Sequence, residues 1–143
     1  MPHVLITTSS FAAQDQKPRL LLERAGLIVQ DNPWGRTLTE GEVRELLRRW
    51  RPVALLAGLE SLDAGVLQEA AAHLKVISRC GAGLDNVDLR AAERLGMAVY
   101  STPEAPSQAV AELTIGLMLS LIRDIPRADR SVRAGAWKKP MGF

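Results

Sequence analysis

Short aliphatic runs alternate along the chain with stretches in which apolar residues recur every three or four positions. This alternation predicts β-α-β units, and therefore a parallel sheet covered by helices. The runs predict five strands, over residues 4–7, 27–29, 53–56, 74–78 and 98–100. The patterns between them predict helices over residues 15–25, 62–71 and 89–95, and one that begins at residue 39 and is closed by Pro52.

Residue types at the predicted helix ends support these assignments. Thr39 and Glu42 have the Ser/Thr-x-x-Glu spacing of a capping box, in which each side chain bonds the backbone of the other residue. The next two helices each have two suitable caps, which are Ser61 or Asp63 and Asn86 or Asp88.

The pattern changes after residue 103, which divides the chain into residues 1–103 and 104–143. Pro103 and Pro106 interrupt the alternation, a helix over residues 107–122 follows, and Pro126 opens a short helix to about residue 133. The longer helix is apolar nearly all round, so it must be buried on several sides. We expect it to contact a second copy of the chain or another domain. Burial in the chain's own core is the simpler alternative.

Composition narrows the class of protein. The 143 residues are 47% apolar and 24% charged, which suits one soluble globular domain. The longest apolar run is too short to cross a bilayer and no export signal is visible, so we expect no membrane span and a cytoplasmic protein. The net charge of +2 is dispersed, which argues against nucleic acid. With a single Cys80 and with His3 and His73 isolated, neither a disulfide nor a metal site is expected.

Doubly wound sheets bind ligands at the carboxyl ends of their strands, so the loops there are the candidate site. The loop after the fourth strand contains Gly81-Ala82-Gly83, whose backbone can approach a ligand closely. Two interpretations are open, an anion cradle and a tight turn that needs a positive φ. The loop is not the dinucleotide fingerprint G-x-G-x-x-G, because Asn86 occupies the sixth position and the loop follows the fourth strand.

The loops offer no obvious group for proton transfer. Cys80 has no base that the sequence places beside it, so we expect it to line the site as a small residue. Arg79 can offer its guanidinium to a carboxylate or form a salt bridge. Glu60 and Asp85 are separated carboxylates. The sequence therefore predicts an anion cradle without an acid–base group.

Four segments, taken in order, resemble a known family. They are VISRCGAGLDNVDL (residues 76–89), STPEA (101–105), AVAELT (109–114) and RAGAW (133–137). On these segments the chain closely resembles the D-isomer-specific 2-hydroxyacid dehydrogenases, and among them the phosphoglycerate dehydrogenase-like members. Each segment alone is weak evidence, whereas their order and spacing together are specific.

The resemblance implies a flavodoxin-like substrate-binding domain over residues 1–103 and interdomain helices over residues 104–143, with a homodimer formed through Ser107–Ile122. It implies hydride transfer between NAD and C2 of a small D-2-hydroxy or 2-oxo acid. It also implies a set of binding residues. The amides of Gly81, Ala82 and Gly83 would hold the substrate carboxylate, Arg79 and Cys80 would line the site, and Ala82 and Val110 would lie beside the nicotinamide.

The sequence departs from the family pattern in two ways. The family's glycine-rich NAD fingerprint, catalytic arginine and His-Glu pair all follow the segment where this sequence ends, so we expect no catalytic residue here and no turnover by the 143 residues alone. The choice between NAD and NADP, and between a fragment and a natural truncation, stays open for the same reason. Phosphoglycerate dehydrogenases commonly carry an arginine after the third strand for the substrate phosphate. This chain has Gly58-Leu59-Glu60 there, which argues against a phosphorylated substrate.

Two other functions are compatible with the residues. A flavodoxin-like binding module would hold an FMN phosphate on Thr7-Thr8-Ser9-Ser10 and stack Trp34 on the flavin. A non-catalytic dimerisation module would keep the helix over residues 107–122 without the chemistry. The resemblance favours the dehydrogenase over both.

Overall fold

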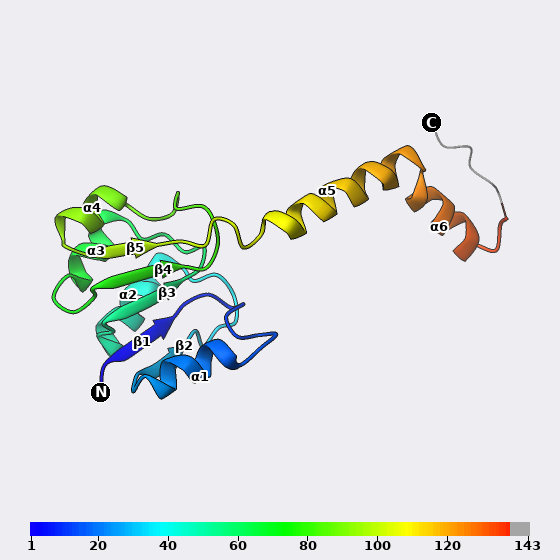
Figure 1. Ribbon diagram of the computed structural model, residues 1–143. Coiled ribbons are helices and arrows are strands. Elements are labelled where there is room, and N and C mark those ends of the chain that lie inside the picture. Colours follow the sequence, from blue (N-terminus) through cyan, green and yellow to red (C-terminus); the bar gives the residue numbers. More distant parts are fainter. Residues whose placement is uncertain (138–143) are drawn as a thin grey trace. The chain divides into compact units, whose positions relative to one another are not determined.

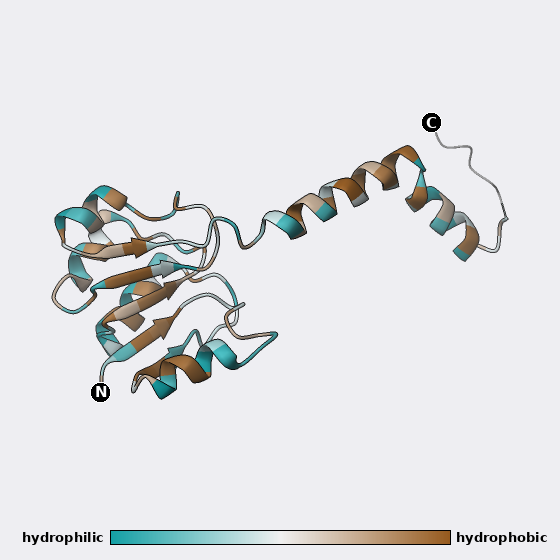
Figure 2. Ribbon diagram, viewed as in Figure 1, coloured by the Kyte–Doolittle hydropathy of each residue, from teal (hydrophilic) through white to brown (hydrophobic). Residues whose placement is uncertain are grey.

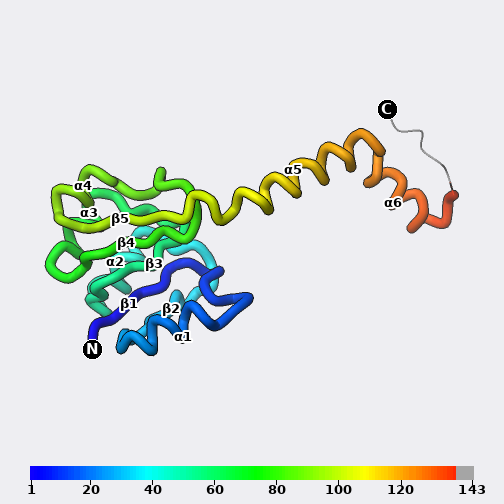
Figure 3. Tube along the Cα trace, in the orientation of Figure 1, coloured from blue at the N-terminus to red at the C-terminus, as the bar shows by residue number. Residues whose placement is uncertain are grey.

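The computed structural model describes residues 1–137, which form two units, Met1–Pro103 and a second unit that begins at Glu104 (Figure 1, Figure 3). The first unit contains a sheet of five parallel strands in the order β2-β1-β3-β4-β5. This confirms the predicted α/β fold with a five-stranded parallel sheet, and the strand order is that of flavodoxin-like sheets. The strands are β1 (His3–Ile6), β2 (Ile28–Asp31), β3 (Ala54–Ala57), β4 (Val76–Arg79) and β5 (Ala98–Tyr100).

The strand ends differ from the predicted ones by one or two residues, except in β5. An apolar run marks burial, whereas a strand is bounded by its backbone hydrogen bonds to neighbouring strands. Leu74 illustrates the difference. Its side chain is fully buried, but its N–H donates to Ala70 O, 2.9 Å away in the preceding helix, so β4 begins only at Val76.

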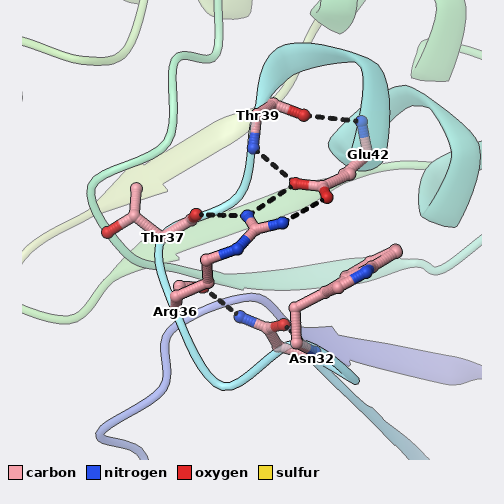
Figure 4. Close-up of polar contacts among 6 residues, drawn as sticks. Asn32, Arg36, Thr37, Thr39 and Glu42 are labelled. Carbon is pink, nitrogen blue, oxygen red and sulfur yellow. Dashed lines mark hydrogen bonds and ion pairs between the residues drawn. The ribbon is translucent and has the colours of Figure 1, made fainter.

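Four helices connect the strands, namely α1 (Lys17–Arg24), α2 (Glu40–Trp50), α3 (Ala64–Ala70) and α4 (Leu89–Arg94). The predicted capping box of α2 is confirmed. Thr39 N donates to Glu42 Oε2 at 2.8 Å, and Glu42 N donates to Thr39 Oγ1 at 3.4 Å (Figure 4). The caps of α3 and α4 are Asp63 and Asp88, each of which accepts a backbone N–H at 2.8 Å.

An ion pair fixes the loop that leads into α2. The guanidinium of Arg36 donates to both carboxylate oxygens of Glu42, at 2.9 and 2.7 Å (Figure 4). Asn32 closes the same loop by donating from Nδ2 to Thr7 O and Arg36 O, both at 2.7 Å. The hydrogen bonds from Arg36 and from the Thr39 backbone lower the pKa of Glu42 to about 2.

The two faces of the sheet are covered to different extents. Helices α2, α3 and α4 lie on one face, and α1 lies on the other beside β2 (Figure 1). The register aligns Leu5, Leu55 and Ile77 in one row, and all three are fully buried in the core beneath α2, α3 and α4. The adjacent row faces the other way. There, Ser78 is half-buried and Tyr100 is 61% exposed, so no helix of the first unit covers the β4–β5 end of that face.

The second unit contains α5 (Ser107–Ile122), with the predicted bounds, and α6 (Ile125–Arg133). Within the described part of the second unit no residue of α5 is buried, and burial of this helix against other parts of the chain stays a prediction. Apolar residues recur along the helix, as Figure 2 shows. No helix among residues 1–137 is long and apolar enough to span a membrane. The exposed apolar residues of α5 are Val110, Leu113, Ile115, Leu117, Met118, Leu119, Leu121 and Ile122.

Candidate functional site

A cavity of about 220 Å³ lies at the edge of the sheet where the strands have their carboxyl ends. It is bounded by the loops that follow β1, β3 and β4. Ligands of doubly wound sheets bind at this edge. The hydroxyl-rich segment of residues 7–10 contributes to its lining, as do Gly58, Glu60, Arg79 and Cys80. The structure therefore brings two of the predicted site residues, Arg79 and Cys80, to one cavity.

Gly81 occupies a position that strongly favours glycine. Its φ of +143° is one that side-chain-bearing residues rarely adopt, and a Cβ there would overlap Nη1 of Arg79. The tight-turn interpretation of this loop is thus confirmed. The Gly81 amide already donates to Thr102 Oγ1 and to Arg79 O, each at 3.0 Å, and Thr102 N donates to Gly81 O at 2.9 Å. These bonds join the loops that follow β4 and β5.

Ala82 and Gly83 present the amides that are free to bind a ligand. Both residues are exposed, and neither amide has an acceptor among residues 1–137. Two successive amides with unsatisfied donors are suited to a carboxylate or another small anion. The anion-cradle interpretation is therefore compatible with the tight turn. Gly81 shapes the loop, and the backbone amides of Ala82 and Gly83 are the available donors.

The side chains of Arg79 and Cys80 have different roles at the cavity. Arg79 donates from Nη1 to Cys80 O at 2.8 Å, while its buried Nε has no partner among the described residues. Burial raises the pKa of the Cys80 thiol, and the Glu60 carboxylate adds to this effect while Arg79 opposes it. A thiol with a raised pKa stays protonated near neutral pH, which disfavours nucleophilic attack, and Cys80 is part of the cavity lining.

The cavity contains the carboxylate of Glu60, whose burial the sequence analysis did not predict. Glu60 is only 1% exposed, although it follows β3 in a loop. Its Oε1 accepts hydrogen bonds from Thr7 Oγ1 and from Gly58 N, the latter at 2.9 Å. Thr7 and Glu60 are 53 positions apart in the sequence, and only the adjacency of β1 and β3 brings them together.

Asn86 holds this loop in place instead of capping α4. Its Nδ2 donates to Glu60 O at 2.7 Å and to Gly58 O at 3.2 Å. In addition, Leu62 N donates to Asn86 O at 2.8 Å. The loop after β3 is therefore hydrogen-bonded to the loop after β4. Residues far apart in the chain thus form the walls of the cavity.

The two histidines lie away from the cavity. His3 opens β1 at the amino end of the sheet and stacks on Trp50, with 5.9 Å between the ring centroids. The pKa of His73 is lowered, mainly by burial and secondarily by the charge of Arg51. Among residues 1–137, no group of three or more His, Cys, Asp or Glu side chains is arranged to hold a metal ion.

Comparison with known proteins decides the family. The sequence model described as "D-isomer specific 2-hydroxyacid dehydrogenase, catalytic domain" matches residues 4–137. The chain belongs to the D-isomer-specific 2-hydroxyacid dehydrogenases. Its resemblance to the phosphoglycerate dehydrogenase-like members is also confirmed, since it is 49% identical over 71 residues to the D-3-phosphoglycerate dehydrogenase of Methanocaldococcus jannaschii. That match covers 50% of this chain and 14% of the relative.

Two further similarities agree with this result. A glyoxylate reductase of Thermofilum pendens is 45% identical over 98 residues, which cover 67% of this chain and 29% of the relative. The structure of a putative NAD-binding D-isomer specific 2-hydroxyacid dehydrogenase from Polaromonas superimposes with a TM-score of 0.82 and 27% identity, covering all of this chain and 44% of that one. The sequence thus spans less than half of the relatives it matches.

Proposed function

We propose that this chain is the N-terminal part of an NAD-dependent oxidoreductase that transfers a hydride between the nicotinamide and C2 of a small D-2-hydroxy or 2-oxo acid. The family membership of residues 4–137 is the observation that carries this proposal. The cavity and the exposed amides of Ala82 and Gly83 support it, because they lie on loops at the edge where such sheets bind ligands. Residues 1–103 would form part of the substrate-binding domain.

The chain's own residues would bind and orient the substrate. The amides of Ala82 and Gly83 would hold its carboxylate, and Arg79 would add positive charge beside them. Gly81 would fix the shape of the loop through its bonds to Thr102 and Arg79. The acid–base group and the residue that polarises the carbonyl would come from segments outside this sequence.

Residues 1–137 would contact only a small part of a nicotinamide cofactor. No glycine-rich loop follows β1, where Thr7 to Ser10 stand, so the described chain has no loop of the dinucleotide-binding type. When bound, the nicotinamide would accept or supply the hydride. We propose that Ala82 and Val110 contribute to the surface beside it, that other segments hold the rest of the cofactor, and that it is NAD.

An activity assay on the whole polypeptide tests this function. We expect the whole polypeptide, of which these 143 residues are a part, to oxidise NADH with at least one short 2-oxo acid. We expect residues 1–143 alone to turn over no 2-oxo acid. Ala82→Asp would place a carboxylate beside the substrate carboxylate and raise KM for every 2-oxo acid by about tenfold or more. Ala72→Asp, the same change at an exposed position away from the cavity, is the control. Activity of residues 1–143 alone, or an unchanged KM in Ala82→Asp, would contradict the proposal.

We further propose that the helix Ser107–Ile122 forms a homodimer interface and the connection between domains. The supporting observation is that its apolar residues are exposed on all sides, for example Leu117 at 61% and Leu121 at 79%. Sedimentation equilibrium should show a dimer, and Leu117→Glu with Leu121→Glu should produce monomers. Gln108→Glu on the same helix is the control. A whole polypeptide that is monomeric at micromolar concentration would refute this interface.

A cytoplasmic location stays a prediction.

The buried carboxylate argues against the alternative of an FMN-binding module. An FMN phosphate on Thr7 to Ser10 would lie beside Glu60, whose carboxylate is hydrogen-bonded to Thr7. Two anionic groups in contact repel each other, so this cavity disfavours a phosphate. A preparation that takes up no FMN would agree with this argument.

A further inference from the structure

The cavity is lined by one buried acidic side chain, that of Glu60. Glu60 lines it while being 1% exposed, so its carboxylate is almost entirely removed from bulk water. Among residues 1–137, none of the ion pairs involves Glu60. Burial of an ionised carboxylate is costly unless hydrogen bonds or an opposite charge compensate it, so the charge acts strongly on whatever occupies the cavity.

The carboxylate also has capacity for a further hydrogen bond. Oε1 accepts from the Thr7 hydroxyl and from Gly58 N at 2.9 Å. Oε2 has only the longer contact with the same Gly58 N–H, at 3.2 Å. A carboxylate offers about four lone-pair positions, so Oε2 can accept a hydrogen bond from a donor in the cavity.

The geometry of the loop keeps this carboxylate in place. A Cβ at Gly58 would lie 2.9 Å from Glu60 Oε2 and 3.1 Å from Thr8 Cα, so glycine makes room for the side chain of Glu60. Asn86 holds the carbonyl groups of Gly58 and Glu60 from the other side. The acceptor therefore has a fixed position relative to Arg79, which lines the same cavity with the opposite charge.

We propose that Glu60 determines the substrate class by accepting a hydrogen bond from an uncharged hydroxyl group at C3 of the 2-oxo or 2-hydroxy acid and by repelling a phosphate at that position. The inference rests on the proposed function. The substrate's carboxylate would lie on the amides of Ala82 and Gly83, with Arg79 nearby, and its C3 end would lie toward Glu60. The preferred substrate class is therefore the short, unphosphorylated 3-hydroxy-2-oxo acids, together with the corresponding 2,3-dihydroxy acids.

Steady-state kinetics of the whole polypeptide test this with hydroxypyruvate, pyruvate and 3-phosphohydroxypyruvate. We expect kcat/KM for hydroxypyruvate to exceed that for the other two by about tenfold or more, since pyruvate lacks the donor and the phosphate is repelled. Glu60→Gln keeps the shape of the side chain and an acceptor oxygen but removes the charge. It should reduce the preference for hydroxypyruvate over 3-phosphohydroxypyruvate by about tenfold, mainly through KM for the phosphorylated compound.

Controls separate specificity from a structural role. Glu45→Gln removes the same charge from an exposed position on α2 and should leave all ratios unchanged. If Glu60 only supported the loop, Glu60→Gln would lower kcat/KM for all three substrates alike, and that result would overturn the inference. A parent enzyme that prefers 3-phosphohydroxypyruvate would overturn it as well.

Calorimetric binding distinguishes this inference from the proposed function. The whole polypeptide should bind D-glycerate more tightly than 3-phospho-D-glycerate, and Glu60→Gln should narrow the difference. Absence of turnover with every 2-oxo acid would count against the proposed function. Equal affinity for the two glycerates in the parent protein would count against the role of Glu60, whether or not turnover is seen.

Discussion

Replacement of Gly58 by alanine tests the packing that holds the buried carboxylate. Gly58 is buried, and an added Cβ would lie 2.9 Å from Glu60 Oε2, 3.1 Å from Thr8 Cα and 3.2 Å from Thr8 Cβ. Non-bonded carbon atoms prefer separations of about 3.5–4.0 Å. The backbone of Thr8 must therefore retreat by several tenths of an ångström, or the Glu60 carboxylate must leave its position.

The expected cost follows from these contacts. Overpacking of a well-packed site costs about 1–3 kcal/mol. Displacement of Glu60 would also weaken its bonds to Gly58 N and Thr7, and a hydrogen bond contributes about 0.5–1.5 kcal/mol. We expect Gly58→Ala to lower the free energy of unfolding by about 2 kcal/mol.

Urea denaturation measures this change through Trp50 fluorescence, in a chain that carries Trp34→Phe and Trp137→Phe so that Trp50 is the only tryptophan. Trp50 is a suitable probe because it is half-buried at the end of α2 and stacks on His3 of β1. With a denaturant slope of about 1–3 kcal/mol/M, the midpoint should fall by about 1 M urea. Gly41→Ala is the matched control, since nothing lies within 4 Å of its added Cβ and alanine is favoured in helix α2. A Gly58→Ala chain as stable as the unsubstituted chain would refute the argument that the added Cβ overpacks this site.

Three further predictions concern stability. Thr39→Ala removes the acceptor for Glu42 N and should lower the free energy of unfolding by about 1 kcal/mol, measured by urea denaturation; an unchanged midpoint would contradict the capping role. The pKa of Glu42 is lowered mainly by Arg36, so the stabilisation from this pair is present above the ordinary glutamate pKa and disappears as pH falls toward about 2. The free energies of unfolding of the unsubstituted chain and of Arg36→Ala, plotted against pH, should therefore converge in acid. Curves that stay parallel would contradict this role of the pair. The pKa of half-buried His73 is lowered in the folded state, so the unfolded chain takes up the proton first and stability should fall as pH drops below about 6.5. His73→Gln should reduce this dependence of stability on pH in melting experiments, and an identical slope would contradict the prediction.

The local elements and the family could be recognised from the sequence. The helix over residues 107–122 has the predicted bounds, because its apolar run lies between Pro106 and Arg123 and needs no distant contact to be helical. The capping box of Thr39 and Glu42 was predictable for the same reason, since both partners lie within one helical turn. The residues of the Gly81-Ala82-Gly83 loop could be placed at the ligand edge, because a parallel sheet brings the carboxyl ends of its strands together.

The burial of Glu60 and its hydrogen-bond partners could not be recognised in this way. In the sequence, Glu60 is an isolated acid in a loop, and nothing adjacent to it signals burial. Its partner Thr7 follows another strand, and its loop is fastened by Asn86, which the sequence offered equally well as a helix cap. The direction of Arg79 across Gly81 also depends on the folded backbone.

The sequence by itself determined the conformation of segments whose stabilising partners lie within a few residues, and it determined the family through motifs in a fixed order. The tertiary structure alone decided which side chains share the cavity. The physical reason is that helix caps and periodic apolar faces are local interactions, whereas the Thr7–Glu60 contact depends on β1 and β3 being neighbours in the sheet. Long-range packing therefore buries Glu60, an acidic residue of a type that is usually exposed.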